Sequence, residues 1–176
     1  MAGREPARLR IRGSTLLADL ALGAAAGVAA TWAMGRVTTF MYEREDEGAK
    51  QREEAVRGGK TADEAMTEKL VGSLGVRLSE PTRRKLGHGM RWAIGAGAGA
   101  VYGVLRRRVP RVDAGQGLAF GAAMFAGLDE GAGTALGVVP PPTAFPWQAH
   151  ARGLAGHLVY GVVTDTLLDA ADRARH

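Results

Sequence analysis

The chain has 176 residues, with 46% hydrophobic and 6% aromatic residues and a net charge of +5. This length allows one domain with its own core, or about four membrane spans of roughly 20 residues each, and excludes several catalytic domains. With no Cys, the chain cannot form a disulfide, a thiolate metal site or a cysteine nucleophile.

The chain begins with a basic segment, residues 1–15, that contains Arg8, Arg10 and Arg12. No separate apolar region with a small-residue cleavage site follows, so we expect a retained cytoplasmic N-terminus and no cleaved signal peptide. Residues 16–41, rich in Gly and Ala, are the first predicted membrane span. At about 1.5 Å per residue, this segment is long enough to cross a hydrocarbon core of roughly 30 Å.

Residues 42–87 predict a charged helical hairpin outside the membrane. The first half continues the first helix with two pairs at helical spacing, Lys50 with Glu54 and Glu53 with Arg57. Gly58 and Gly59 then end that helix. Thr61 and Glu64 form a capping-box pattern for a second helix, whose apolar face holds Met66, Leu70 and Leu74.

Ser79, with Pro81 in the following turn, is expected to start the helix that leads into the second span, residues 88–105. That span contains "GAGAGAVYG", in which Gly95, Gly97 and Ala100 fit a loose dinucleotide-binding fingerprint. The next strand of such a unit would have to form from "RRRVPRV", which is basic and contains a proline. A soluble nucleotide-binding protein is therefore kept only as an alternative.

Helix packing explains more of the glycines. Small residues spaced four apart let helix backbones approach closely in lipid. The pattern recurs in three of the four apolar segments: Gly95, Gly99 and Gly103; Gly23 and Gly27; Gly117 and Gly121; Gly127 and Gly131; Gly133 and Gly137. The motif "GGKT" at 58–61 lacks the first glycine of a phosphate-binding loop, because Glu54 occupies that position, and we interpret it as a helix end followed by an N-cap.

The remaining segments alternate between basic and uncharged connections. They are a basic cytoplasmic loop (106–113), span three (114–138), a Pro-rich outer loop (139–148), span four (149–168) and a cytoplasmic tail (169–176). This alternation predicts four spans with both termini in the cytoplasm. Arg83, Arg84 and Lys85 would then lie outside, and the mean hydropathy of -0.07 is low, so a soluble helical bundle is the alternative.

The stretch "AGLDEGAG" places Asp129 beside Glu130 within span three. A charge inside a bilayer usually faces the bundle interior and finds a partner. The topology puts four other ionisable residues at a similar depth or in the outer third, and Asp19 and Asp165 near the inner face. We therefore predict a buried polar cluster of Asp129, Glu130, His157, Arg91, His88 and Arg36.

Within this cluster we expect Arg91 to pair with Asp129 or Glu130. Neighbouring residues on a helix point about 100° apart, so the two acids share a partner only at a helix break, which the flanking glycines permit. The cluster is interpreted either as a structural network or as titrating groups that handle protons or a small polar ligand. A metal site that also used His150 has no supporting spacing, and His150 is expected to be an ordinary interfacial residue.

The stretch Leu136 to Gly161 carries "GVVPP", "PW" and "GHLV". In these motifs it resembles the YagU-like bacterial inner-membrane proteins of unknown function, over about residues 115–168. His157 matches that pattern, whereas the acidic pair does not. The resemblance implies a multi-span inner-membrane protein and supplies no cofactor or reaction.

The sequence thus predicts an all-α, four-span inner-membrane protein that is not an enzyme, with no cofactor and no metal. Its predicted partners are the lipid bilayer and a second copy or another membrane protein, and no nucleic acid. The predicted role is proton-linked or small-solute handling, or envelope stress tolerance. The alternative is a structural or assembly protein that docks a partner through the hairpin at 42–79.

Overall fold

The computed structural model describes residues 16–137 and 139–174, and every regular element in these ranges is helical. This confirms the predicted all-α class for the described residues. In chain order the elements are α1 (Leu16–Glu43), α2 (Glu47–Arg57), α3 (Ala62–Gly72), α4 (Glu80–Leu105), α5 (Leu118–Met124), the π-helix η1 (Phe125–Ala132), α6 (Gly133–Ala135), the 3-10 helix η2 (Pro142–Ala144) and α7 (Trp147–Arg173).

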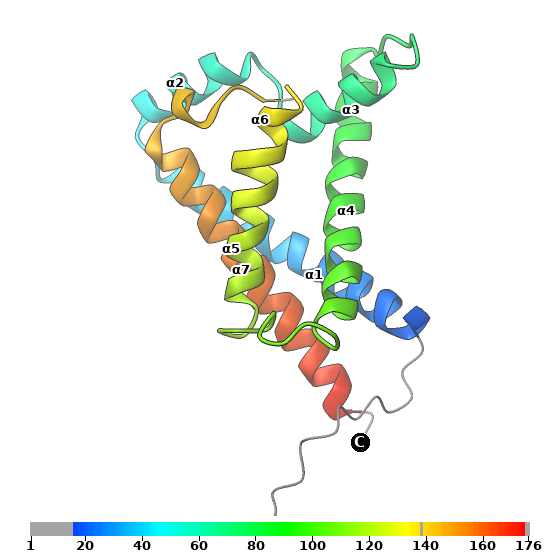
Figure 1. Cartoon of the computed structure of the whole chain (residues 1–176). Coiled ribbons are helices and arrows are strands. Elements are labelled where there is room, and N and C mark those ends of the chain that lie inside the picture. The colour runs from blue at the N-terminus through cyan, green and yellow to red at the C-terminus, as the bar shows by residue number, and fades with distance from the viewer. Residues whose placement is uncertain (1–15, 138, 175–176) are drawn as a thin grey trace, which may run out of the picture.

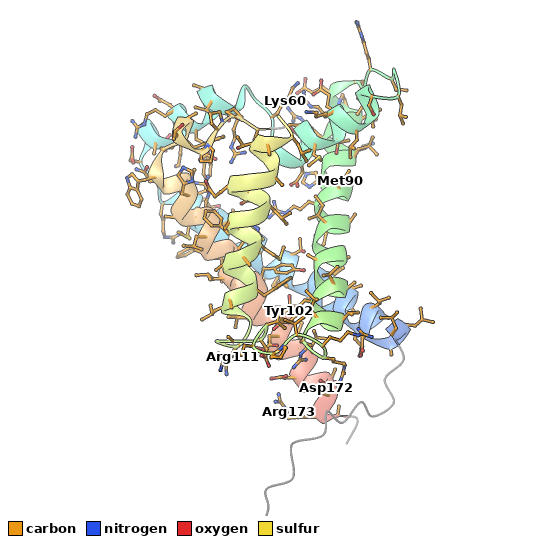
Figure 2. The ribbon with its side chains drawn as sticks, in the orientation of Figure 1. Lys60, Met90, Tyr102, Arg111, Asp172 and Arg173 are labelled. Carbon is orange, nitrogen blue, oxygen red and sulfur yellow. The ribbon has the colours of Figure 1, made fainter. Side chains whose placement is uncertain are left out.

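Three long helices form the frame of the molecule. α1 packs against both α4 and α7, and α5 packs against α7 (Figure 1). The hairpin of α2 and α3 lies at one end of this bundle. The connection from α4 to α5 lies at the opposite end, near the start of α1 and the end of α7. Figure 2 shows Lys60 at the hairpin end and Tyr102, Arg111 and Asp172 toward the other end.

Glycines allow α1 and α4 to lie almost backbone to backbone. A Cβ added to Gly99 would lie 2.7 Å from Cα of Gly27, closer than real Cβ contacts. The predicted packing role is confirmed for Gly23, Gly27, Gly95, Gly99 and Gly103, and for Gly117 and Gly121 against α7. It is wrong for Gly127, which has open space around its Cβ position, and for Gly131, which approaches only its own helix.

These contacts also exclude the dinucleotide-loop interpretation. "GAGAGA" lies inside the continuous helix α4, where Gly95 and Gly99 face α1, so no turn is available to bind a phosphate. The "GGKT" motif ends α2, as predicted. Gly58 adopts a left-handed conformation at φ 58°, and Thr61 caps α3 in a capping box with Glu64.

The hairpin differs from prediction at its beginning. The first helix does not continue into the charged segment, because Asp46 accepts a hydrogen bond from the Ala49 amide and starts α2 anew. Lys50 pairs with Glu47 and not with Glu54, whereas the predicted pair of Glu53 with Arg57 forms at 2.8 Å. α4 begins at Glu80 after the N-cap Ser79, as expected.

One helix, α1, is long and apolar enough to cross a membrane by length and composition. The other three predicted spans do not reach this level among the described residues. α4 carries Arg83, Arg84, Lys85 and Arg91, and α7 carries charged residues at both ends. The four-span arrangement is therefore still a prediction.

The segment predicted as span three is also less regular than expected. Residues 114–117 form a turn in which Gln116 and Gly117 have positive φ, so the helix starts only at Leu118. It then passes into the π-helix η1 at Phe125, and the short α6 ends at Ala135. The acidic pair thus lies in a widened helical turn.

A candidate site in a cavity lined by two acid–histidine pairs

A cavity of about 650 Å³ lies between the hairpin and the helices α1, α4, η1 and α7. Its walls are mainly apolar and aromatic, with Met34, Met66, Met124, Phe125 and Phe145 among the lining residues. Charged side chains from α2, α3, α4, η1 and α7 also reach into it. A concave, largely apolar site with a few converging polar groups is typical of small-molecule binding.

The π-helix η1 explains how two adjacent acids both reach this cavity. In η1 the backbone amide of Gly133 bonds to the Leu128 carbonyl, five residues back, which widens the turn that contains Asp129 and Glu130. Both carboxylates line the cavity and face α7, where each meets a different histidine. Such π-bulges are rare and are frequently found at functional sites.

Glu130 and His150 share a proton. His150 Nε2 lies 3.0 Å from the Pro142 carbonyl, and because a carbonyl only accepts, Nε2 carries a hydrogen. His150 Nδ1 lies 2.7 Å from Glu130 Oε1. This contact requires one further proton, either on the imidazole or on the carboxyl group. His150, which was expected to be an ordinary interfacial residue, thus contacts a member of the predicted polar cluster.

Asp129 and His157 form the second pair. His157 is buried, and its Nδ1 donates to the Gly153 carbonyl at 2.9 Å. Asp129 Oδ2 lies 3.6 Å from the same nitrogen, and 46% of the Asp129 side chain is exposed. In this tautomer Nε2 is the position that accepts a second proton, which would make the contact an ion pair. The ring of Phe125 packs 5.9 Å from the His157 ring.

Arg91 and Asp63 reach the cavity without a direct partner. Neither side chain makes a hydrogen bond or ion pair with any residue of the described ranges. Burial raises the pKa of Asp63 above its ordinary value, against the opposing charges of Arg91 and His88. The predicted pairing of Arg91 with Asp129 or Glu130 is not formed, because the two acids contact histidines on α7.

Two members of the predicted cluster lie outside the cavity. Arg36 and His88 are exposed and are absent from its lining, although the charge of His88 acts on Asp63. The structure thus brings together Asp129, Glu130, His157 and Arg91 of the six predicted residues.

Arg152 is the residue that the sequence analysis missed. It is buried on α7, contacts Glu45, and reaches Glu53 with Nη2 at 2.6 and 2.5 Å from the two carboxylate oxygens. Burial opposes ionisation of Glu53, but the hydrogen bonds from Arg152 and the charge of Arg57 prevail and lower its pKa. The rule that singled out Asp129, a charge within a predicted span, applies equally to Arg152.

The possible metal ligands do not converge. Among the described residues, no group of three His, Asp or Glu side chains is arranged to hold a metal ion. Instead the donors form two separate pairs, one at 2.7 Å between Glu130 and His150 and one at 3.6 Å between Asp129 and His157. The residues present therefore fit proton exchange better than metal coordination.

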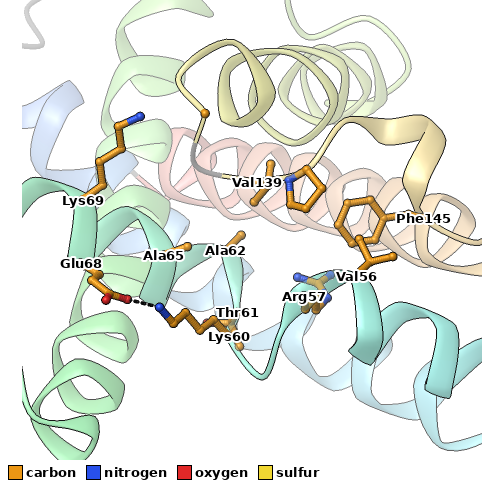
Figure 3. Close-up of a pocket in the computed structure, with 12 residues that line it drawn as sticks. Val56, Arg57, Lys60, Thr61, Ala62, Ala65, Glu68, Lys69, Val139 and Phe145 are labelled. Atoms are coloured by element: carbon orange, nitrogen blue, oxygen red, sulfur yellow. Dashed lines mark hydrogen bonds and ion pairs between the residues drawn. The ribbon is translucent and has the colours of Figure 1, made fainter.

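A second pocket of about 410 Å³ lies beside the first, between the α2–α3 hairpin and the segment that leads to η2 (Figure 3). Its cationic groups are already used. Lys60 pairs with Glu68 at 2.6 Å, and Lys69 donates to the Leu136 carbonyl. For this reason we place the candidate site in the larger cavity.

Comparison with protein-family models, with curated proteins and with solved structures finds no match to this chain.

Proposed function

We propose that this protein is a helical inner-membrane protein whose cavity binds a small solute in a proton-linked manner, without catalysing a reaction. The observation that carries the proposal is that two acid–histidine pairs line one cavity of about 650 Å³. The Glu130–His150 pair holds a proton that a solute could displace, and the Asp129–His157 pair can take one up. A histidine is the side chain whose charge changes between about pH 5 and 8.

Three observations support the membrane location. α1 has the length and hydropathy of a span. Large apolar side chains are exposed along the long helices: Val28 and Trp32 on α1, Trp92 and Val101 on α4, and Leu154 and Leu167 on α7. Arg107 in the α4–α5 connection forms ion pairs with Asp19 at the start of α1 and with Asp172 at the end of α7. These contacts fit a topology in which both termini lie on one side of a bilayer.

Two measurements test the proposal. An alkaline carbonate wash of membranes should leave the tagged full chain in the pellet, and release into the supernatant would overturn the membrane location. Binding to the purified protein is then measured at pH 5.5 and pH 8 for four probes that share a phenyl ring: benzyltrimethylammonium, phenylalanine, benzyl alcohol and benzoate. At least one should bind with pH-dependent affinity.

The matched variants are His157→Phe in the cavity and His88→Phe on the exposed face of α4. The first should remove the pH dependence of binding, and the second should leave it unchanged. Binding of none of the four probes, or equal pH dependence in both variants, would contradict the proposed function.

A second candidate function is docking of a partner protein through the hairpin. It is favoured by Leu70 and Leu74 at the end of α3, whose side chains are 51% and 79% exposed, in contrast to Met66, which faces the cavity. Replacing both leucines with Ser should then leave solute binding intact and abolish the association of the protein with its partner in cross-linked membranes.

A further inference from the structure

The charge of the cavity lining indicates which class of solute it takes. Five carboxylates reach the cavity: Glu53, Glu54, Asp63, Asp129 and Glu130. Three guanidinium groups reach it: Arg57, Arg91 and Arg152. The Glu130–His150 pair is neutral as a unit because it holds one proton, so with His157 neutral the lining carries one negative charge without a basic counterpart. Such a surface attracts cations and repels anions.

Two of the three arginines are already used. Arg152 is held by Glu45 and Glu53, and Arg57 binds Glu53 at 2.8 Å and lies over the ring of Phe145. Only Arg91 remains to face an incoming anion. Its charge acts on both Asp63 and Asp129, so part of it is already neutralised inside the cavity.

The uncharged part of the lining suits an organic cation. Four aromatic rings line the cavity, those of Tyr42, Phe125, Phe145 and Tyr160. Aromatic faces attract quaternary ammonium groups, and such contacts gain strength when water is excluded. The three methionines on α1, α3 and α5 supply flexible apolar surface that adapts to different shapes.

We propose that the solute is an organic monocation with an apolar body, held by the carboxylates of Asp63 and Asp129 and by the aromatic walls. This inference rests on the proposed function and specifies its substrate class. The cation and a proton compete for the same charge, since protonating His157 beside Asp129 would neutralise the surplus negative charge. Entry of the cation therefore releases protons, and low pH weakens its binding.

Several charged and titratable groups surround the two pairs and act on this competition. The titratable and charged groups that face them are Tyr42 from α1, Glu53, Glu54 and Arg57 from α2, Asp63 from α3, Arg91 from α4, and Arg152 and Tyr160 from α7. The arginines stay charged throughout pH 5 to 8. Because burial raises the pKa of Asp63, this acid and the histidines are the groups that can exchange the proton.

The test is the affinity of the four phenyl probes for the purified full-length protein. Benzyltrimethylammonium has a permanent charge, so any pH dependence of its binding comes from the protein. It should bind at least tenfold more tightly than phenylalanine, benzyl alcohol or benzoate at pH 8. Its dissociation constant should rise by up to tenfold per pH unit as pH falls, the limit for release of one proton.

Asp129→Asn should weaken binding of this cation at least tenfold, and Asp63→Asn provides a second variant on another helix if the first does not fold. Glu80→Gln, an exposed acid paired with Arg84 outside the cavity, is the matched control and should bind as the unmodified protein does. Tightest binding of phenylalanine, benzyl alcohol or benzoate would overturn the cation assignment and leave the proton-linked function standing. Binding of no probe would overturn both.

Discussion

The two ends of the bundle treat buried charge in opposite ways. At the end away from the hairpin, Arg106 contacts Asp165, Asp169 and Asp172, and Arg107 binds Asp19 and Asp172 at 2.8 and 2.7 Å. In the cavity, by contrast, Asp63 and Arg91 have no direct partner in the described chain, and Asp129 has only His157. The paired end joins three helices, whereas the cavity keeps charge available.

The pairing of a charge decides whether it can contribute binding energy to a ligand. A charge that is matched by a rigid neighbour contributes to the fold and has little left for a ligand. An unpaired charge in a concave site lowers the stability of the protein, and a bound ligand of opposite charge restores that stability. Substitutions at the paired positions should therefore lower stability, and substitutions in the cavity should mainly change binding.

The largest loss of stability is expected on replacing Arg152, which binds Glu45 and Glu53 at the hairpin end of the cavity. Arg152→Met removes the guanidinium that binds Glu45 and the buried Glu53, leaving Glu53 with Arg57 alone, and loss of one partner of a buried pair costs about 3 to 5 kcal/mol. Chemical denaturation of the purified protein measures this loss. Arg52→Met, on the exposed face of α2, is the control and should change stability by less than about 0.5 kcal/mol.

The same variant has a pH signature. In the unmodified protein the pKa of Glu53 is lowered, so the stability that its ion pairs supply is present above the unfolded pKa of about 4.3 and is lost as pH falls through the lower folded value. In Arg152→Met only Arg57 still opposes the burial of Glu53, so this loss of stability at low pH should be smaller than in the unmodified protein. If Arg152→Met lowers stability by the same amount at every pH, the role assigned to this pair is wrong.

A smaller loss of stability is expected at the close, uncharged contact between α1 and α4. Gly99→Leu places a side chain against the α1 backbone near Gly27, and overpacking of this kind typically costs about 1 to 3 kcal/mol. Gly97→Leu is a matched control on the same helix, because the Cβ position of Gly97 has open space around it. Equal unfolding midpoints for the two variants would show that the α1–α4 contact is not as close as described.

A loss of about 1 kcal/mol is expected at the paired end from Tyr102→Phe. It removes the hydrogen bond of 2.8 Å that the buried tyrosine donates to Asp165 and keeps the ring packed on Phe120. Tyr42→Phe is the control, since the Tyr42 ring contacts Arg152 and Lys50 through its face. The two melting curves should separate only for Tyr102→Phe.

The smallest effect on stability, a slight gain, is expected from replacing Asp63 in the cavity. Burial raises the pKa of Asp63, so the folded chain holds this proton more tightly than the unfolded chain and gains stability as pH falls through the raised value. Asp63→Asn should be as stable as the unmodified protein at pH 7, or slightly more so, and should lack this gain at low pH. A clear loss of stability at pH 7 would contradict the view that cavity charges are held at a cost.

Local signals in the sequence predicted much of the fold. The capping box at Thr61, the helix end at Gly58 and the glycine spacing of α1 and α4 each depend on a few neighbouring residues, and all are found. The break at Asp46 was missed because an N-cap inside a charged run resembles a helix interior.

The site was predicted only in part, because its partners are set by tertiary contacts. A charge inside an apolar segment identified Asp129, Glu130 and His157, but nothing in the sequence indicates a π-helix. The widened turn places Glu130 in contact with His150, so Arg91 lacks the acid that it was expected to bind. Arg152 and Glu53 are about a hundred residues apart, and no local pattern joins them.

If the cavity exchanges protons for solute, binding of a probe must change the number of protons bound to the protein. The purified protein, weakly buffered at pH 7, is mixed with whichever of the four phenyl probes binds most tightly, and the protons released or taken up are measured with a pH indicator. We predict a change of about half to one proton per bound probe, which falls toward zero in the double variant Asp129→Asn, Glu130→Gln. Saturating binding without any change in bound protons would contradict this exchange.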